Sequence, residues 1–141
     1  MSENPVALPA EIENPRHARA GIAKKTVLIF SPDLNFSFSL SMVLQDRYHV
    51  VTTSNSAMIE SFASTYAADI AIVDAVPTEM FIRQIDAIKK LRPGLSVIMT
   101  YVYDSRDVRL DDCVRSHVDA VLYKPFEADA VLCQVERLLL D

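Results

Sequence analysis

Three side chains of chemical interest follow hydrophobic, strand-like runs. Asp74 ends Ile-Ala-Ile-Val-Asp, Thr100 ends Val-Ile-Met-Thr, and Lys124 follows Ala-Val-Leu-Tyr. A carboxylate at a buried strand end needs a cationic partner, which a lysine can supply. A carboxylate beside a lysine and a hydroxyl can act as a nucleophile toward a phosphoryl group, while its neighbours bind the transferred oxygens. These residue types therefore indicate a minimal site for holding a phosphoryl group.

Positioning these residues requires strands that end at one edge. Five β-prone runs alternate with segments whose apolar residues recur at helical spacing. The predicted strands are 26–30, 48–53, 69–74, 95–101 and 119–123. The predicted helices begin near 36, 55, 81, 104 and 128. Strict alternation predicts βαβ units, and hence a doubly wound α/β domain with a parallel sheet covered on both faces. Ligands of such sheets bind outside the carboxyl ends of the strands, where the three residues are expected to converge.

Composition excludes several function classes. The chain has 141 residues, the size of one domain, and a net charge of -5, which disfavours binding to nucleic acid. Its two glycines, Gly21 and Gly94, are too far apart for a glycine-rich phosphate loop. The two cysteines, Cys113 and Cys133, form no zinc motif and are predicted to pack as small hydrophobic residues in helices. Without a signal peptide or membrane-spanning run, we expect a cytoplasmic protein.

The first part of the chain differs from the rest. Residues 1–24 contain Pro5, Pro9 and Pro15 and show no sustained hydrophobic period. This pattern predicts a flexible N-terminal arm, with a docking tail as the functional alternative. The folded domain is then expected to span residues 25–141.

Over residues 25–141, the strand-end residues and the Lys124-Pro125-Phe126 motif resemble the receiver domains of bacterial response regulators. The resemblance implies the flavodoxin-like strand order 2-1-3-4-5 and a cis bond before Pro125. It also implies that Asp74 accepts a phosphoryl group, that Thr100 is a switch hydroxyl, and that Lys124 contacts the phosphoryl group. Members of the family receive this group from a histidine kinase or a phosphotransfer protein, with Mg²⁺. They are signalling domains rather than enzymes, with at most self-phosphorylation and dephosphorylation, here at Asp74.

The sequence departs from the family pattern at the metal site. The two adjacent acids that bind magnesium in the family fall here on Ser31 and Pro32. Because magnesium prefers anionic oxygen ligands, this loss predicts weak metal binding. Asp74 remains as an acidic ligand, and Asp33 is one position beyond the usual pair.

The switch positions differ as well. Val121 occupies the position of the family's switch aromatic residue, and Tyr123 directly precedes the lysine. Tyr101 follows the switch hydroxyl, where its ring could fill the channel used by the switch. Tyr101, Tyr103 and Tyr123 are expected near one rim, either packed there with wet hydroxyls or forming an aromatic patch for a partner.

The sequence leaves two functional hypotheses open, and a third is less favoured. The first is a receiver that accepts a phosphoryl group on Asp74 and signals through a protein partner. The alternative is a phosphorylation-independent pseudo-receiver that acts as a protein-interaction module. The third is an unrelated flavodoxin-like binding domain. By analogy with the family, we expect a protein partner to bind the face built by the fourth helix, fifth strand and fifth helix. A homodimer is a further possibility. Binding to nucleic acid or to a membrane is not expected.

Two surface features receive plain structural interpretations. The charges of the helix predicted over 104–116, Asp111 among them, are expected to form a solvated face. Phe36 and Phe38 are expected to pack within the first helix of the domain, although their alternate placement could expose one of them.

Overall fold

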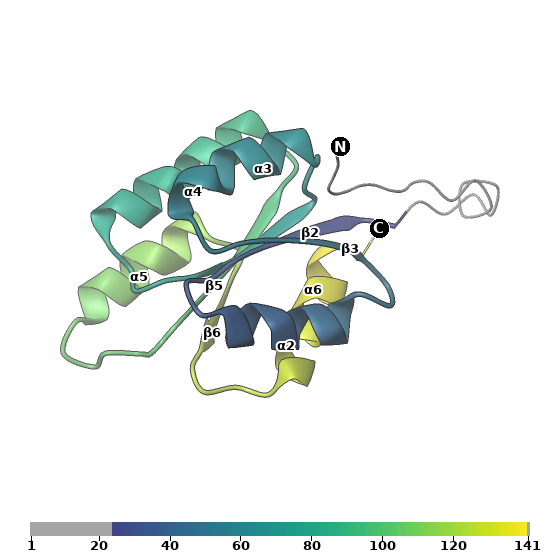
Figure 1. The fold of residues 1–141 in the computed structure, drawn as a ribbon. Coiled ribbons are helices and arrows are strands. Elements are labelled where there is room, and N and C mark those ends of the chain that lie inside the picture. The colour runs from purple at the N-terminus through teal and green to yellow at the C-terminus, as the bar shows by residue number, and fades with distance from the viewer. Residues whose placement is uncertain (1–23, 141) are drawn as a thin grey trace, which may run out of the picture.

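The computed structural model describes residues 24–140, so the predicted arm lies outside the described residues except for Lys24. These residues form one α/β domain with a parallel sheet (Figure 1). The strands are β2 (Thr26–Phe30), β3 (His49–Thr53), β4 (Ile70–Asp74), β5 (Ser96–Tyr101) and β6 (Ala120–Tyr123). The helices are α2 (Leu34–Leu44), α3 (Ile59–Thr65), α4 (Glu79–Leu91), α5 (Val108–His117) and α6 (Ala128–Leu138), with a 3-10 turn, η1 (Ser56–Met58), before α3.

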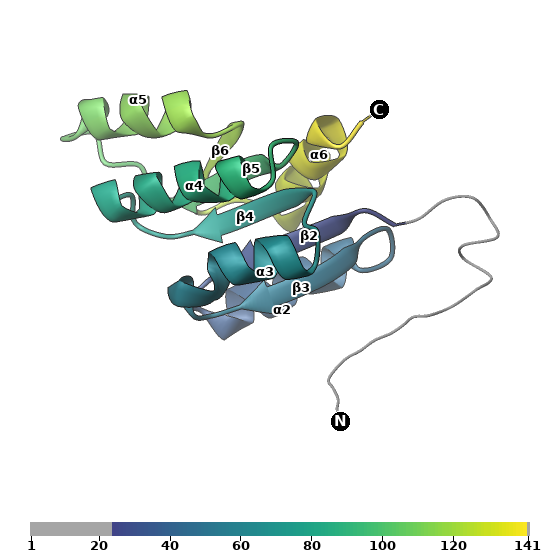
Figure 2. The ribbon, with the colours of Figure 1, turned by 90° about the horizontal axis from the view of Figure 1, so that it is seen from above.

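The sheet order is β3-β2-β4-β5-β6, and every neighbouring pair is parallel. In chain order this is 2-1-3-4-5, as predicted. Helices α3, α4 and α5 cover one face of the sheet, and α2 and α6 cover the other (Figures 1 and 2). The doubly wound fold class predicted from the alternation of elements is therefore confirmed.

The central strands are apolar on both sides because both faces of the sheet are covered. Every residue of β2 and β4 is buried. Successive side chains point to opposite faces, so Leu28 and Val73 join the core under α3, α4 and α5, whereas Ile29 and Ile72 join the core under α2 and α6. This alternation also decides on which face each polar residue at the strand ends lies.

Two sequence-based expectations about the helices were wrong in detail. The fourth predicted helix does not begin at Asp104. The corresponding helix, α5, begins at Val108, after Asp107, whose carboxylate accepts a hydrogen bond from the backbone amide of Leu110. Cys113 and Cys133 lie on α5 and α6 as expected, but both are exposed rather than packed as hydrophobic residues. Within the part of the chain that the structure describes, no helix is long and apolar enough to cross a membrane.

Candidate functional site

The carboxylate of Asp74 lies at the carboxyl edge of the sheet and is almost completely buried. Register pairs Asp74 with Thr100 across β4 and β5. The hydroxyl of Thr100 donates to Asp74 Oδ1 at 2.9 Å, and the ammonium of Lys124 donates to the same oxygen at 3.1 Å. The three residues singled out from the sequence therefore meet in space, on the side of the sheet covered by α2 and α6.

Ser31 completes the surroundings of this carboxylate. Its hydroxyl donates to Asp74 Oδ2 at 2.6 Å and accepts a hydrogen bond from the backbone amide of Asp33 at 3.0 Å. Ser31 and Thr100 are both fully buried. From the sequence, Ser31 was considered only as the residue that replaces a metal-binding acid, and its direct hydrogen bond to Asp74 was not predicted. Both oxygens of the carboxylate are thus hydrogen-bonded, and Oδ1 has both of its acceptor sites in use.

Lys124 is held from two directions. It forms an ion pair with Asp74, and its ammonium lies 4.7 Å from the ring centroid of Phe36, a cation–π contact. The ring of Phe36 in turn packs edge-on against Phe126, with centroids 5.9 Å apart. The peptide bond between Lys124 and Pro125 is cis, in agreement with the resemblance. Helix α2 and the segment after β6 together place the cation over the acid.

The donor set at this site does not fit magnesium. The metal prefers several anionic oxygens in octahedral geometry. Here one carboxylate is paired with one ammonium, so their charges offset, and the position next to Asp74 holds a neutral hydroxyl that already donates to it. No cluster of three or more His, Cys, Asp or Glu side chains suited to a metal occurs among residues 24–140.

Asp33, the other acid considered for the metal, has a structural role. It caps α2: its Oδ1 accepts hydrogen bonds from the backbone amides of Asn35 and Phe36 at 3.0 and 3.3 Å. Removing a side-chain cap costs about 1 kcal/mol. We therefore expect Asp33→Ala to lower the free energy of unfolding by about 1 kcal/mol, with the same loss in the presence and absence of Mg²⁺. Urea denaturation measures this loss, and a loss that appears only with Mg²⁺ would instead assign Asp33 to a metal.

A second polar cluster lies on the opposite side of the sheet. Tyr101 and Tyr123 are register partners on β5 and β6, and both hydroxyls donate to the carboxylate of Asp111 on α5, at 2.5 Å for Tyr101 and 2.8 Å for Tyr123. Arg115 donates from Nε to Asp111 at 3.2 Å and from its guanidinium to the hydroxyl of Tyr123. We call Tyr101, Tyr123, Asp111 and Arg115 the α5 clamp, because they join this helix to two strands.

Burial and hydrogen bonding shape the electrostatics of the α5 clamp. Burial raises the pKa of Tyr101 far above its usual range, and the nearby Asp111 raises it further. Burial alone would raise the pKa of Asp111, but hydrogen bonds from Tyr101, Tyr123 and Arg115 outweigh it and lower that pKa. Asp111 therefore stays ionised and the tyrosines stay protonated, which keeps every donor and acceptor matched.

The structure assigns positions to the predicted switch residues. Tyr101 is buried and points to α5 rather than to Asp74, and Val121 packs beside the same core. Tyr103 packs against the ring of Tyr123 at 5.1 Å between centroids and remains partly exposed. The expectation that Asp111 belongs to a solvated face was wrong. The burial of Asp111 could have been predicted from the two tyrosines at adjacent strand ends, because buried tyrosine hydroxyls require a hydrogen-bond acceptor.

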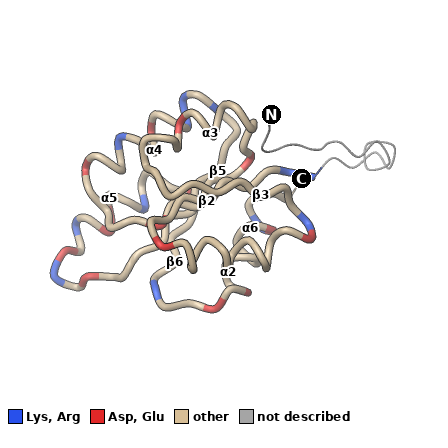
Figure 3. The backbone as a smooth tube through the Cα atoms, viewed as in Figure 1, with Lys and Arg blue, Asp and Glu red and all other residues tan. Residues whose placement is uncertain are grey.

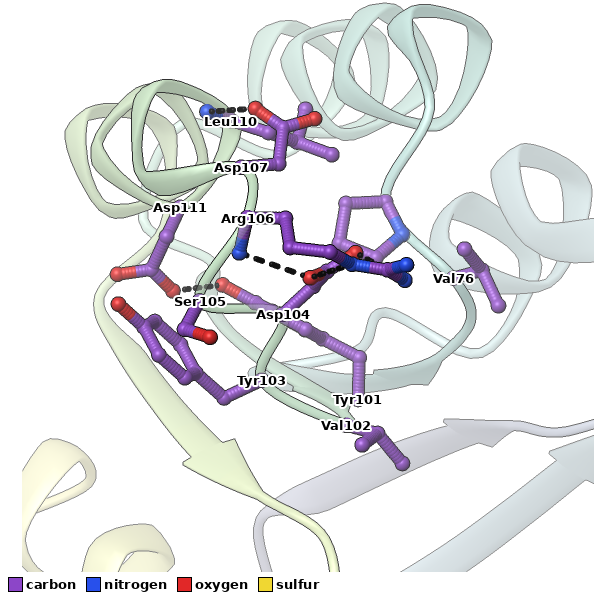
Figure 4. A pocket seen from close by; sticks show the side chains of 11 residues that line it. Val76, Tyr101, Val102, Tyr103, Asp104, Ser105, Arg106, Asp107, Leu110 and Asp111 are labelled. Atoms are coloured by element: carbon purple, nitrogen blue, oxygen red, sulfur yellow. Dashed lines mark hydrogen bonds and ion pairs between the residues drawn. The ribbon is translucent and has the colours of Figure 1, made fainter.

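A pocket of about 400 Å³ opens beside the α5 clamp (Figure 4). Its walls come from the β4–α4 loop at Val76 and Pro77 and from the β5–α5 loop, residues 102–107. Its acids already have partners: Asp104 pairs with Arg106, and Asp107 caps α5. The pocket is therefore a hollow at the rim, and no unpartnered charge in it indicates a particular ligand.

These observations define a doubly wound, flavodoxin-like α/β domain with an acid–hydroxyl–lysine site at the carboxyl edge of its sheet. Among solved structures, a response regulator of Thermotoga maritima matches with a TM-score of 0.73 and 20% identity, covering 84% of this chain and 100% of that one. A CheY-like receiver domain of Methanospirillum hungatei matches with a TM-score of 0.71 and 22% identity, covering 82% and 94%. The fold is that of response regulator receiver domains.

Another structural neighbour is described as a pilus assembly-related protein rather than as a response regulator. This protein of Burkholderia pseudomallei matches with a TM-score of 0.67 and 27% identity, covering 82% of this chain and 89% of that one. No family model and no curated protein matches the sequence.

Proposed function

We propose that this chain is a phosphorylation-independent pseudo-receiver that works as a protein-interaction module. One observation carries the proposal: Ser31 donates a 2.6 Å hydrogen bond to Asp74 from the position where the family has a metal-binding acid. A carboxylate whose two oxygens are both hydrogen-bonded is a weaker nucleophile, and the site lacks the anionic ligands that would recruit magnesium. The site then serves to hold the sheet edge together.

The phospho-accepting receiver is the second candidate, supported by a specific observation. Thr100 and Lys124 contact Asp74 at 2.9 and 3.1 Å, and the resemblance assigns this same pair to phosphoryl binding. Under this alternative, a histidine kinase or phosphotransfer protein supplies the group, and Mg²⁺ is required. The two candidates differ in whether Asp74 is ever modified.

Intact mass separates the two candidates. We expect wild-type protein incubated with a small acyl phosphate and Mg²⁺ to gain no phosphoryl group, because the site binds the metal poorly. Asp74→Asn is the matched control, and an authentic receiver treated in parallel shows that the donor works. A single phosphoryl group on the wild type that is absent from Asp74→Asn would overturn the pseudo-receiver and establish the second candidate.

The proposed partner is another protein, bound on the face built by α5, β6 and α6. The α5 clamp supports this choice because it holds α5 in one place without a phosphoryl group. The similarity at 27% identity to a pilus assembly-related protein suggests components of pilus assembly as the first partners to screen. A partner of a pseudo-receiver binds Asp74→Asn as tightly as the wild type, whereas a partner of a switching receiver distinguishes phosphorylated from unphosphorylated protein.

A further inference from the structure

Among the α-helices that the structure describes, α2 differs from α3, α4, α5 and α6 in having no charged residue. Its sequence, Leu-Asn-Phe-Ser-Phe-Ser-Leu-Ser-Met-Val-Leu, is apolar on two opposite sides. Leu40 and Leu44 face the core, as expected for a helix that covers a sheet. A surface helix normally places charged and polar side chains on the side away from the core. Figure 3 shows the tube along α2 free of both charge colours, whereas α4, α5 and α6 carry them.

The outward side of α2 carries a stripe of large apolar side chains. Leu34, Phe38 and Met42 are 69%, 66% and 53% exposed. They are four residues apart, so they lie in one row along the helix. The expectation that Phe38 packs within the helix was therefore wrong, and the exposure admitted for one of the two phenylalanines falls on Phe38. We call Leu34, Phe38 and Met42 the α2 stripe.

We propose that the α2 stripe is a homodimer contact in which two copies of this chain pack α2 against α2 around a two-fold axis at Phe38. Phe38 lies near the middle of Leu34–Leu44. In an antiparallel two-fold pairing centred there, Phe38 meets its own copy and Leu34 meets Met42 of the partner subunit. Every large side chain of the stripe then finds an apolar counterpart, because an isologous contact uses the same patch twice.

The absence of charge on the α2 stripe permits a second copy as the occupant. Each copy carries a net charge of -5 and so repels a second copy overall, which means that two copies can meet only where the contact itself is uncharged. The flanking acids do not clash in this register, because Asp33 lies opposite Val43 of the partner subunit and Asp46 lies beyond the end of the partner's helix. Rows of residues spaced by four also suit the commonest crossing of two packed helices.

The area of the contact sets its strength. A single 11-residue helix presents less surface than the roughly 800 Å² per partner found in standard stable interfaces. The dimer is therefore weak, and it forms as concentration rises rather than persisting on dilution. This inference stands on α2 alone and is independent of whether Asp74 is phosphorylated.

Sedimentation equilibrium tests the dimer from micromolar to millimolar concentrations. We expect the average mass to rise from 15.8 kDa toward twice that value. Phe38→Glu should abolish the rise, because it places two carboxylates on the two-fold axis. Val102→Glu is the matched control, since Val102 is as exposed as Leu34 but lies on the β5–α5 loop, and it should dimerise like the wild type. A wild type that stays monomeric throughout, or a Val102→Glu that also abolishes the rise, overturns the proposal.

Cysteine cross-linking tests the register. In a background with Cys113→Ser and Cys133→Ser, which removes both exposed thiols, Phe38→Cys should form a disulfide-linked dimer on mild oxidation. Leu34→Cys should link poorly to itself but readily to Met42→Cys when the two variants are mixed. Equal linking of Phe38→Cys and a Val102→Cys control would reflect random collision and would contradict the two-fold arrangement.

Discussion

Asp111→Ala is expected to lower the free energy of unfolding by about 3 kcal/mol, the cost of removing one partner from a buried charged network. The variant leaves the buried hydroxyl of Tyr101 without its acceptor and removes the acceptor of Tyr123 and Arg115 as well. For a domain of this size, the loss corresponds to a fall of roughly 10 °C in the unfolding temperature. Urea denaturation measures it, provided that the dependence on urea concentration is unchanged.

Asp112→Ala is the matched control, because Asp112 lies on the same helix but is exposed. It should change stability by less than about 0.5 kcal/mol. Equal losses for Asp111→Ala and Asp112→Ala would show that helix α5 is generally sensitive and that the α5 clamp has no special role.

The pH dependence gives a second measure of the same prediction. The pKa of Asp111 is lower in the folded protein than its unfolded value near 3.9. Such a group stabilises the folded state fully above the unfolded pKa and loses that contribution as the pH falls through the folded pKa. The stability difference between the wild type and Asp111→Asn should therefore be constant near neutral pH and shrink below about pH 4. A difference independent of pH would mean that the carboxylate contributes through shape alone.

The second large effect is expected from Ser31→Asp combined with Pro32→Asp. A carboxylate at position 31 replaces the hydroxyl that donates to Asp74 Oδ2, so two buried anions come into contact. Without a divalent ion, we expect the double variant to lose about 2 kcal/mol of stability at neutral pH, because a buried hydrogen bond is replaced by repulsion. Millimolar Mg²⁺ should restore the loss, since a ligand at 100 times its dissociation constant adds about 2.7 kcal/mol.

Thermal unfolding with and without Mg²⁺ measures this effect. The wild type should show no resolvable shift with the metal, because its single carboxylate is already paired with Lys124. Adding Asp74→Asn to the double variant should weaken the metal dependence. If Mg²⁺ does not stabilise the double variant, the missing acids are not the reason for poor metal binding, and the interpretation of Ser31 and Pro32 as replaced ligands is wrong.

The sequence alone predicted the framework of the site. Runs such as Ile70–Asp74 are apolar without interruption and end at a polar residue, which is typical of strands buried on both faces. Because parallel strands end at one edge, the meeting of Asp74, Thr100 and Lys124 followed from the element order. The hydrogen bond from Ser31 was not predicted, because a serine at a strand end carries no pattern that separates a donor from a solvated side chain.

The misplaced surface residues have a different cause. Periodicity shows which side of a helix is buried only when the other side is polar. Helix α2 is apolar on both sides, so the pattern could not decide that Phe38 and Met42 face outward. On α5, charged residues surround Asp111 in sequence, and the pattern therefore indicated a solvated side. Its burial depends on tyrosines from two strands, a contact that no local window of sequence contains.

The parallel pairing of every strand determines when the site can form as the chain folds. No two neighbouring strands can close as a local hairpin, because each pair is bridged by a helix crossover. Such distant pairings form slowly, because the entropy of closing long loops is lost before their contacts form. On a growing chain, β3, β2 and β4 can associate before residue 124 has been synthesised. Asp74 is then expected to lie at the sheet edge without its ion-pair partner. The ion pair with Lys124, which follows the last strand, is therefore expected to form as one of the final events of folding.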